Sequence, residues 1–176
     1  MKVLVACEES GRVREEFTKL GHDAWSCDMQ PTAIPGNHYQ GDVRDILSQD
    51  WDIIIAHPPC TYIANSGVQH LHKNAKRWIN MYEACDFFKL FLDHPCERIC
   101  IENPIPHKYA VKLLGRKYNQ IIQPWQFGHG ESKATCFWLK GLPKLEPTKI
   151  VEGREQKMWK LPPRPERQKL RSRTYP

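Results

Sequence analysis

The chain has 176 residues, of which 40% are hydrophobic and 26% are charged, as in ordinary globular domains. This length predicts one domain with its own core, and no apolar run approaches the roughly 18 residues of a membrane span. The seven cysteines are irregularly spaced and the eight histidines form no ligand cluster, so we expect reduced thiols and no metal site. The N-terminus does not resemble a signal peptide, and we expect a cytoplasmic protein.

The formal net charge of +6 is concentrated at the C-terminal end of the chain. Residues 151–176 contain eight Lys or Arg against three Glu, whereas the preceding residues are nearly neutral. Trp159 and Tyr175 lie among these charges, which favours contact with the phosphates of a nucleic acid. We therefore predict a catalytic domain over residues 1–145 and a basic, proline-containing tail over residues 146–176.

The first half of the chain alternates apolar runs with loops and one helical pattern. Residues 3–6 and 24–27 read as strands, and residues 11–20 read as a helix with its apolar side chains on one face. A proline-containing loop and Gly41-Asp42-Val43 precede a short helical segment. The isoleucines at 53–55 predict a central strand that is buried on both faces.

The second half continues this alternation. Apolar residues recur at steps of three and four over residues 75–92, which predicts a long amphipathic helix. A strand is expected at 98–101, a short helix at 109–114, and further strands at 120–123 and 135–139. The pattern predicts an α/β fold with a doubly wound, mostly parallel sheet of the Rossmann-like type.

Polar residues follow three of the predicted strands, and a fourth lies in Gly41-Asp42-Val43. Asp28, Asp42, Cys60 and Glu102 would meet at one edge of the sheet if the strands are parallel, and open α/β sheets bind their ligands at that edge. Each residue alone has an ordinary explanation, such as a helix cap, an inert thiol or a surface ion pair. Together they indicate a site.

Four motifs in this order carry a family resemblance: Gly41-Asp42-Val43, Pro58-Pro59-Cys60, Ile101-Glu102-Asn103-Pro104, and Phe127-Gly128 followed by Glu131-x-Lys133-x-Thr135. From residue 3 to about residue 139 the chain resembles the DNA (cytosine-5)-methyltransferases. It is most similar to a compact type from phages and prophages that lacks a full target-recognition domain. The resemblance implies methyl transfer from S-adenosylmethionine to C5 of cytosine, with DNA as the partner.

The resemblance also implies roles for individual residues. Cys60 would be the nucleophile and Glu102 the residue that contacts the cytosine ring. The cofactor contacts would be Gly11, Asp28, Asp42 and Pro58, and the substrate contacts would be Asn103, Lys133 and Thr135. The first loop, residues 7–12, keeps only Gly11 of the family's glycine-rich loop, and it also reads as a helix start that is capped by Ser10.

The chemistry of cytosine suits these residue types. C5 becomes nucleophilic only after a group adds at C6, and a thiolate both adds and leaves readily. Glu102, protonated or sharing a proton with N3, would withdraw electron density from the ring. A free thiol titrates at about 8.5, so Cys60 needs a nearby cation, for which His57 and Lys133 are candidates. A base in a duplex would have to be flipped out to reach such a site.

Other functions stay open at this level. An amino-methyltransferase would share the two prolines of His57-Pro58-Pro59-Cys60, with Tyr62 as the stacking ring. A degenerate methyltransferase fold could bind nucleic acid without turnover, and Cys60 with His57 or His129 could form a hydrolase pair. The Glu102-Asn103-Pro104 motif favours the carbon methyltransferase. The sequence does not distinguish duplex DNA from single strands, RNA or a nucleotide as substrate.

Overall fold

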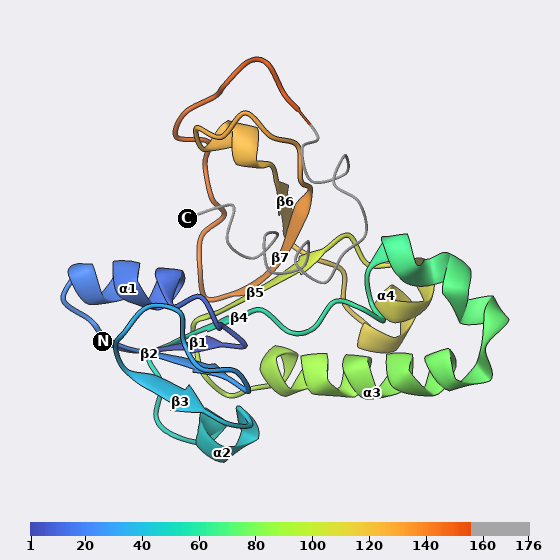
Figure 1. Cartoon of the computed structure of the whole chain (residues 1–176), viewed down its shortest axis with the longest axis horizontal. Coiled ribbons are helices and arrows are strands. Elements are labelled where there is room, and N and C mark those ends of the chain that lie inside the picture. Colours follow the sequence, from blue (N-terminus) through green and yellow to red (C-terminus); the bar gives the residue numbers. More distant parts are fainter. Residues whose placement is uncertain (156–176) are drawn as a thin grey trace.

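The computed structural model describes residues 1–155 of the chain (Figure 1). Within this range seven strands form a sheet in the order β3-β2-β1-β4-β5-β7-β6. The strands are β1 (Lys2–Ala6), β2 (Asp23–Asp28), β3 (His38–Gln40), β4 (Ile53–Ala56), β5 (Ile99–Pro104), β6 (Gln120–Ile122) and β7 (Thr135–Lys140). The neighbouring strands β3, β2, β1, β4 and β5 all run parallel to one another, and β7 runs antiparallel to both of its neighbours, β5 and β6.

Helices cover both faces of the sheet, with α1 on one side and α3 on the other (Figure 1). The helices are α1 (Arg12–Lys19), α2 (Arg44–Leu47), α3 (Ala75–Leu92) and α4 (Lys108–Leu114), with 3-10 segments η1 (Asn65–Lys73) and η2 (Pro124–Gln126). This is the doubly wound, mostly parallel α/β fold of the Rossmann type that the sequence predicts.

The alternation of side chains along the central strands builds a core on each face. Val3, Val5 and Ile53 point toward α1, whereas Leu4 and Ile54 lie in the larger core under α2, α3 and α4. A continuous β-branched run is therefore used on both sides, as expected of a central parallel strand. This burial fixes the register in which β1 and β4 end together.

The predicted helix over residues 75–92 is confirmed with the same bounds as α3. Its buried side chains recur every three or four residues: Met81, Cys85, Phe88 and Phe91. The expected strands at 3–6, 24–27, 53–55, 120–123 and 135–139 are each found within one residue at either end. The three-residue strand β3 was not predicted.

One strand boundary was predicted wrongly. The strand expected at 98–101 is β5, which continues to Pro104, so Glu102 and Asn103 lie within the strand and not after it. The reason is the antiparallel partner β7, which pairs along all of β5 and places Glu102 opposite Phe137. The ladder therefore holds the backbone of both motif residues.

The segment that follows β7 returns to the loop after β6. Lys149 forms a bridge with Phe127, and the Val151 amide donates to the Trp125 carbonyl at 2.9 Å. The Arg154 guanidinium lies 3.7 Å from the centre of the Trp125 ring. Residues 156–176, which hold most of the basic tail expected to contact phosphates, lie outside the described residues. In the part of the chain that the structure describes, no helix is both long and apolar enough to cross a membrane.

Candidate active site

The predicted site residues leave the sheet at one edge. β1, β2 and β4 end in register, since Ala6 pairs with both Cys27 and Ala56. The His57 amide continues the ladder by donating to the Ala6 carbonyl at 2.9 Å. Because these strands are parallel, Cys7, Asp28 and His57 emerge together at the carboxyl edge, where open α/β folds bind ligands.

Cys60 lies on a tight turn just beyond β4. Its carbonyl accepts hydrogen bonds from the amides of Ile63 at 3.1 Å and Ala64 at 2.8 Å, and its side chain is half-buried. The two prolines before it restrict the backbone and so limit the entropy lost in positioning the thiol. The turn is therefore ordered without help from a long helix.

The Cys60 turn is anchored to the end of β5. The Asn103 side chain, only 1% exposed, donates from Nδ2 to the Pro58 carbonyl at 2.8 Å. The Asn65 amide donates to the Ile105 carbonyl at 2.8 Å. The predicted substrate contact Asn103 thus has a structural role, because it ties the motif that carries Glu102 to the motif that carries Cys60.

His107 adds a second anchor between the same two segments. Its Nδ1 accepts the Ala110 amide at 3.0 Å and so caps α4, which leaves Nε2 as the donor to the Tyr62 carbonyl at 3.0 Å. The His107 amide also donates to the Ile63 carbonyl at 3.0 Å. Sequence reasoning missed this buried histidine, since the Tyr62 carbonyl that its Nε2 binds lies 45 residues earlier in the chain.

Glu102 is paired with His57. His57 Nδ1 lies 3.2 Å from Glu102 Oε2, and the two side chains are 28% and 22% exposed. Burial alone would raise the pKa of Glu102, but the hydrogen bond and charge of His57, helped by Lys133, hold that pKa below its usual value. Burial likewise opposes the charged form of His57, but Glu102 and then Glu8 raise the pKa of the imidazole. The arrangement favours an imidazolium and a carboxylate.

Glu8 occupies the start of α1. This buried carboxylate, 4% exposed, accepts the Val13 amide at 2.7 Å and the Arg14 amide at 3.2 Å. The expectation that Ser10 caps this helix is wrong, because Gly11 is the residue at the cap position. The Ser10 hydroxyl donates to Glu8 at 3.1 Å and accepts the Arg12 amide at 3.4 Å. An acidic side chain thus fills the helix terminus that attracts anions.

Gly11 has a packing role in this loop. Its φ of 69° is left-handed, and an added Cβ would lie 2.6 Å from Arg14 Nη2 and 2.8 Å from Thr32 Oγ1. Arg14 is 2% exposed and donates to the Ile34 carbonyl at 2.6 Å. The glycine is therefore explained by the buried arginine beneath it, and its contact with a cofactor stays a prediction.

Asp28 and Asp42 are brought together near Cys7. The Gly41 amide donates to the Asp28 carbonyl at 3.0 Å, which places the segment of Asp42 beside the end of β2. Burial first, and then the charges of Asp28 and Asp42, raise the pKa of Cys7 to about 12. Each carboxylate also caps its own turn, since Asp28 accepts the Gln30 amide and Asp42 the Arg44 amide, both at 2.9 Å.

The remaining predicted substrate residues lie at the start of β7. Thr135 pairs with Pro104 in the ladder, and its hydroxyl donates to the Lys133 carbonyl at 3.2 Å. The charge of Lys133 acts on both Glu102 and His57. The structure thus brings Lys133 to the acid–imidazole pair, whereas the Thr135 hydroxyl is used within its own turn.

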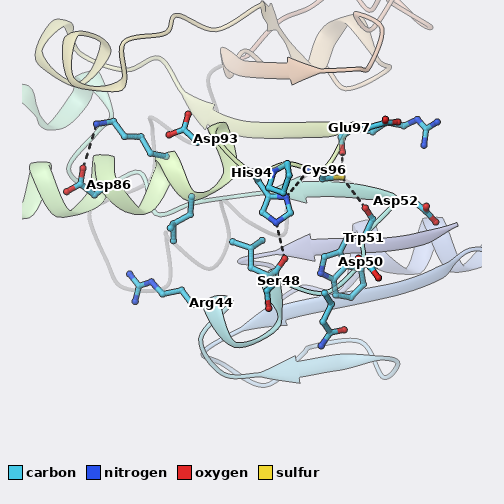
Figure 2. A pocket seen from close by; sticks show the side chains of 16 residues that line it. Arg44, Ser48, Asp50, Trp51, Asp52, Asp86, Asp93, His94, Cys96 and Glu97 are labelled. Carbon is cyan, nitrogen blue, oxygen red and sulfur yellow. Dashed lines mark hydrogen bonds and ion pairs between the residues drawn. The ribbon is translucent and has the colours of Figure 1, made fainter.

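A cavity of about 1060 Å³ opens at the opposite edge of the sheet, where none of these residues lies (Figure 2). It is bounded by the end of α2, the C-terminal end of α3 and the segment that leads into β5. His94 Nε2 bonds to the Leu47 carbonyl at 3.0 Å, and the Cys96 thiol donates to the Trp51 carbonyl at 3.2 Å. These polar groups hold two loops together and converge on no shared ligand position.

Comparisons with known proteins yield a match in structure and none in sequence. No family model matches the chain, and no curated protein matches it. The fold is similar to a crystal structure from E. coli that is described as a DNA modification methyltransferase encoded within a prophage, with a TM-score of 0.53 and 16% sequence identity. The match covers 86% of this chain and 52% of that one, so the chain spans about half of its length. The chain therefore has the same Rossmann-like α/β fold as that protein.

Proposed function

We propose that the protein transfers a methyl group from S-adenosylmethionine to C5 of cytosine in DNA, through a covalent bond between Cys60 and C6 of the base. The observation that carries the proposal is the anchoring of the Cys60 turn on β5, the strand that holds Glu102. A chain that only binds nucleic acid has no need to anchor a turn that carries a thiol to a strand that carries a carboxylate. The similarity of the fold to a protein described as a DNA modification methyltransferase supports the same function.

The carboxyl edge offers groups that fit the cofactor. Asp28 and Asp42 are carboxylates at neighbouring strand ends, and such oxygens accept hydrogen bonds from ribose hydroxyls and an adenine amino group. The start of α1 is filled by Glu8, so that terminus suits a cationic group better than a carboxylate. S-adenosylmethionine, when bound, supplies an electrophilic methyl group. In this arrangement its ammonium would lie toward Glu8, and its ribose and adenine toward Asp28 and Asp42.

Glu102 acts on the cytosine ring as a carboxylate that His57 holds in place. The sequence suggested a protonated Glu102, or one that shares a proton with N3, and the pairing with His57 favours the second form. An ionised carboxylate accepts a hydrogen bond from the exocyclic amino group and stabilises a proton on N3. The protonated N3 withdraws electron density from C6. His57 is a positioning residue in this account, because it orients Glu102 and keeps it ionised.

Cys60 then carries the covalent step. The Cys60 thiol loses its proton to solvent and the thiolate adds to C6, while N3 takes up a proton from solvent that Glu102 stabilises, so that C5 becomes the nucleophile that accepts the methyl group. Loss of the C5 and N3 protons to solvent and expulsion of the thiolate restore the aromatic ring and the enzyme. Pro58 and Asn103 keep the thiol in position through their mutual hydrogen bond, which limits the entropic cost of attack.

The alternative of an amino-methyltransferase needs a free stacking ring, for which Tyr62 was the candidate. The Arg77 guanidinium lies 5.0 Å from the centre of that ring, and His107 holds the Tyr62 carbonyl. The ring is therefore already engaged by the protein. This favours the reaction at carbon over a reaction at the exocyclic nitrogen.

The experiment that tests the cofactor half of the proposal is a calorimetric titration of the full chain with S-adenosylmethionine. Saturable binding that Asp42→Ala weakens by at least tenfold supports the proposal. Asp45→Ala is the matched control, because Asp45 lies three residues away and only accepts the Tyr39 hydroxyl at 2.9 Å. Equal weakening by both variants, or no binding by the wild-type chain, would contradict the assignment of Asp42.

A further inference from the structure

Two long stretches of the chain carry no acidic residue. Residues 53–82 and 103–130 contain no Asp or Glu, and the rest of the chain holds all 20 of them. The first stretch contains three Lys or Arg and the second contains four. We call these seven residues the basic face: Lys73, Lys76, Arg77, Lys108, Lys112, Arg116 and Lys117. All of them are exposed except Arg77, which is half-buried.

The two stretches meet in space. Three segments lie together at one end of the molecule: η1, the first turns of α3, and α4 (Figure 1). Three aromatic rings join them, with Trp78 and Tyr109 at 5.1 Å, His72 and Trp78 at 5.6 Å, and a hydrogen bond of 3.4 Å between the Tyr109 hydroxyl and His72 Nε2. The basic face is therefore held on packed elements and is organised before any partner binds.

The basic face continues into the candidate active site. Arg77 stacks over Tyr62, which lies two residues after Cys60 in the chain. Tyr62 is in turn fixed by His107, the residue that caps α4. A polyanion lying on the basic face would thus pass beside the Cys60 turn.

We propose that the basic face binds the phosphate backbone of duplex DNA next to the target base. The inference rests on the proposed function for its location beside Cys60, and it adds a surface within residues 1–155 that is independent of the basic tail. The cations lie on η1, α3, α4 and the turn after α4, in stretches of sequence without Asp or Glu, and they suit a run of phosphates, whose neutralisation releases counterions. Such contacts position the nucleic acid without reading its sequence.

The aromatic residues favour a duplex over a single strand at this surface. Proteins that bind single strands present open ring faces on which successive bases stack. Here His72, Trp78 and Tyr109 meet edge to face at interplanar angles of 68° to 73°, so the rings pack against one another. Tyr62 is covered by Arg77. The surface offers charges for a backbone and few free faces for bases.

The test compares two triple variants of the full chain that change the net charge equally. The first is Lys73→Glu with Lys76→Glu and Lys112→Glu, three exposed residues of the basic face. The control is Lys19→Glu with Lys89→Glu and Arg98→Glu, three residues that are not part of the basic face. Lys89 is on the last turn of α3, about 20 Å along the helix from Lys76 at 1.5 Å per residue.

Binding of a short fluorescent duplex is followed by anisotropy over a range of salt concentrations. The basic-face variant should bind at least tenfold more weakly than the control. The log–log slope of its affinity against salt should fall by about 0.9 for each phosphate that the variant no longer neutralises. Equal binding by the two variants would overturn the proposal. So would a wild-type chain that binds single-stranded DNA or RNA more tightly than the duplex.

A second measurement needs no variant and so does not depend on folding of the triple mutants. Bound duplex should protect Lys73, Lys76 and Lys112 from an amine-reactive reagent, as read by mass spectrometry, and leave Lys19 and Lys89 reactive. Lack of protection would contradict the basic face. The S-adenosylmethionine titration separates the two proposals, because a chain that binds the cofactor but protects none of these lysines loses the docking surface alone.

Discussion

His57 Nδ1 and Glu102 Oε2 lie 3.2 Å apart, and they join the ends of β4 and β5 at the edge where Cys60 is placed. The pair is more than a surface ion pair, since both side chains are largely buried. Removal of the imidazole leaves Glu102 with the effect of burial, which raises its pKa. His57→Gln should therefore shift the acidic limb of the pH–rate profile to higher pH.

The measurement for that prediction is methyl transfer by wild type and His57→Gln across pH, with His129→Gln as a control. A profile that keeps its acidic limb in place, at whatever reduced rate, would show that His57 does not keep Glu102 ionised.

The stability of the fold should also depend on the His57–Glu102 pair. The lowered pKa of Glu102 gives stability that is lost as pH falls through the folded-state value, and the raised pKa of His57 gives stability that is lost as pH rises through its own.

The stabilising effect of the pair should thus be largest between the ordinary values of the two groups, 4.5 for Glu102 and 6.5 for His57. Urea unfolding of wild type and His57→Gln at several pH values measures this difference directly. A difference that is constant over this range and beyond it on both sides would contradict the pairing.

Asn103 should matter for the covalent step more than for the cofactor. Asn103→Ala removes the hydrogen bond to Pro58 and leaves that buried carbonyl without its donor, at a cost of about 1–3 kcal/mol in unfolding free energy. The rate of reaction at Cys60 should fall while the affinity for S-adenosylmethionine stays within about twofold. Asn119→Ala, which removes an exposed bond to the Leu139 amide, is the control. Parallel losses of cofactor affinity and rate would argue against a role confined to the Cys60 turn.

Glu8 should stabilise α1 measurably. Glu8→Ala removes the acceptor for the Val13 and Arg14 amides and should lower the free energy of unfolding by about 1–2 kcal/mol, the usual range for a lost helix cap. Glu16→Ala breaks only an exposed pair with Lys19 and should cost less than about 0.5 kcal/mol. Urea denaturation of both variants compares them, and equal costs would rule out the capping role of Glu8.

Gly11 offers a separate test of the packing under the first loop. Gly11→Ala and Gly21→Ala both place a side chain at positive φ, but only the first meets atoms, those of Arg14 and Thr32. The shared backbone strain is about 1–2 kcal/mol. Gly11→Ala should be more destabilising than Gly21→Ala in thermal or urea unfolding. If the two substitutions cost the same, Arg14 is free to move and Gly11 is not explained by its packing.

The edge of the sheet that carries the candidate site could be anticipated because parallel strands end together. The apolar runs in β1 and β4 and the periodicity of α3 are strong local signals, and they place the Cys60 turn at the carboxyl edge of the sheet. The position of Glu102 after its strand was predicted wrongly, because pairing with β7 extends β5 to Pro104. Strand β3 escaped prediction because His38–Gln40 is short and polar, so its pairing with β2 has no apolar pattern behind it.

The groups that support the site left little signal in the sequence. Glu8 and Arg14 are charged residues in a segment that reads as a solvated helix start, yet both are buried. Amides at the start of α1 satisfy Glu8, and carbonyls of a distant loop satisfy Arg14. Asn103 and His107 bind carbonyls that lie 45 residues earlier in the chain. Such partners follow from tertiary structure, and neither composition nor spacing reveals them.

The most direct test of the account is a search for a covalent bond at Cys60. The full chain is incubated with S-adenosylmethionine and DNA that contains 5-fluorocytosine, whose fluorine cannot leave as a proton does, so a C6 adduct persists. Mass spectrometry should find the adduct on Cys60 in wild type and in Cys100→Ser, which changes another half-buried thiol near Glu102, and no adduct in Cys60→Ser. An adduct that persists in Cys60→Ser, or a chain that methylates DNA without forming one, would contradict the proposed mechanism.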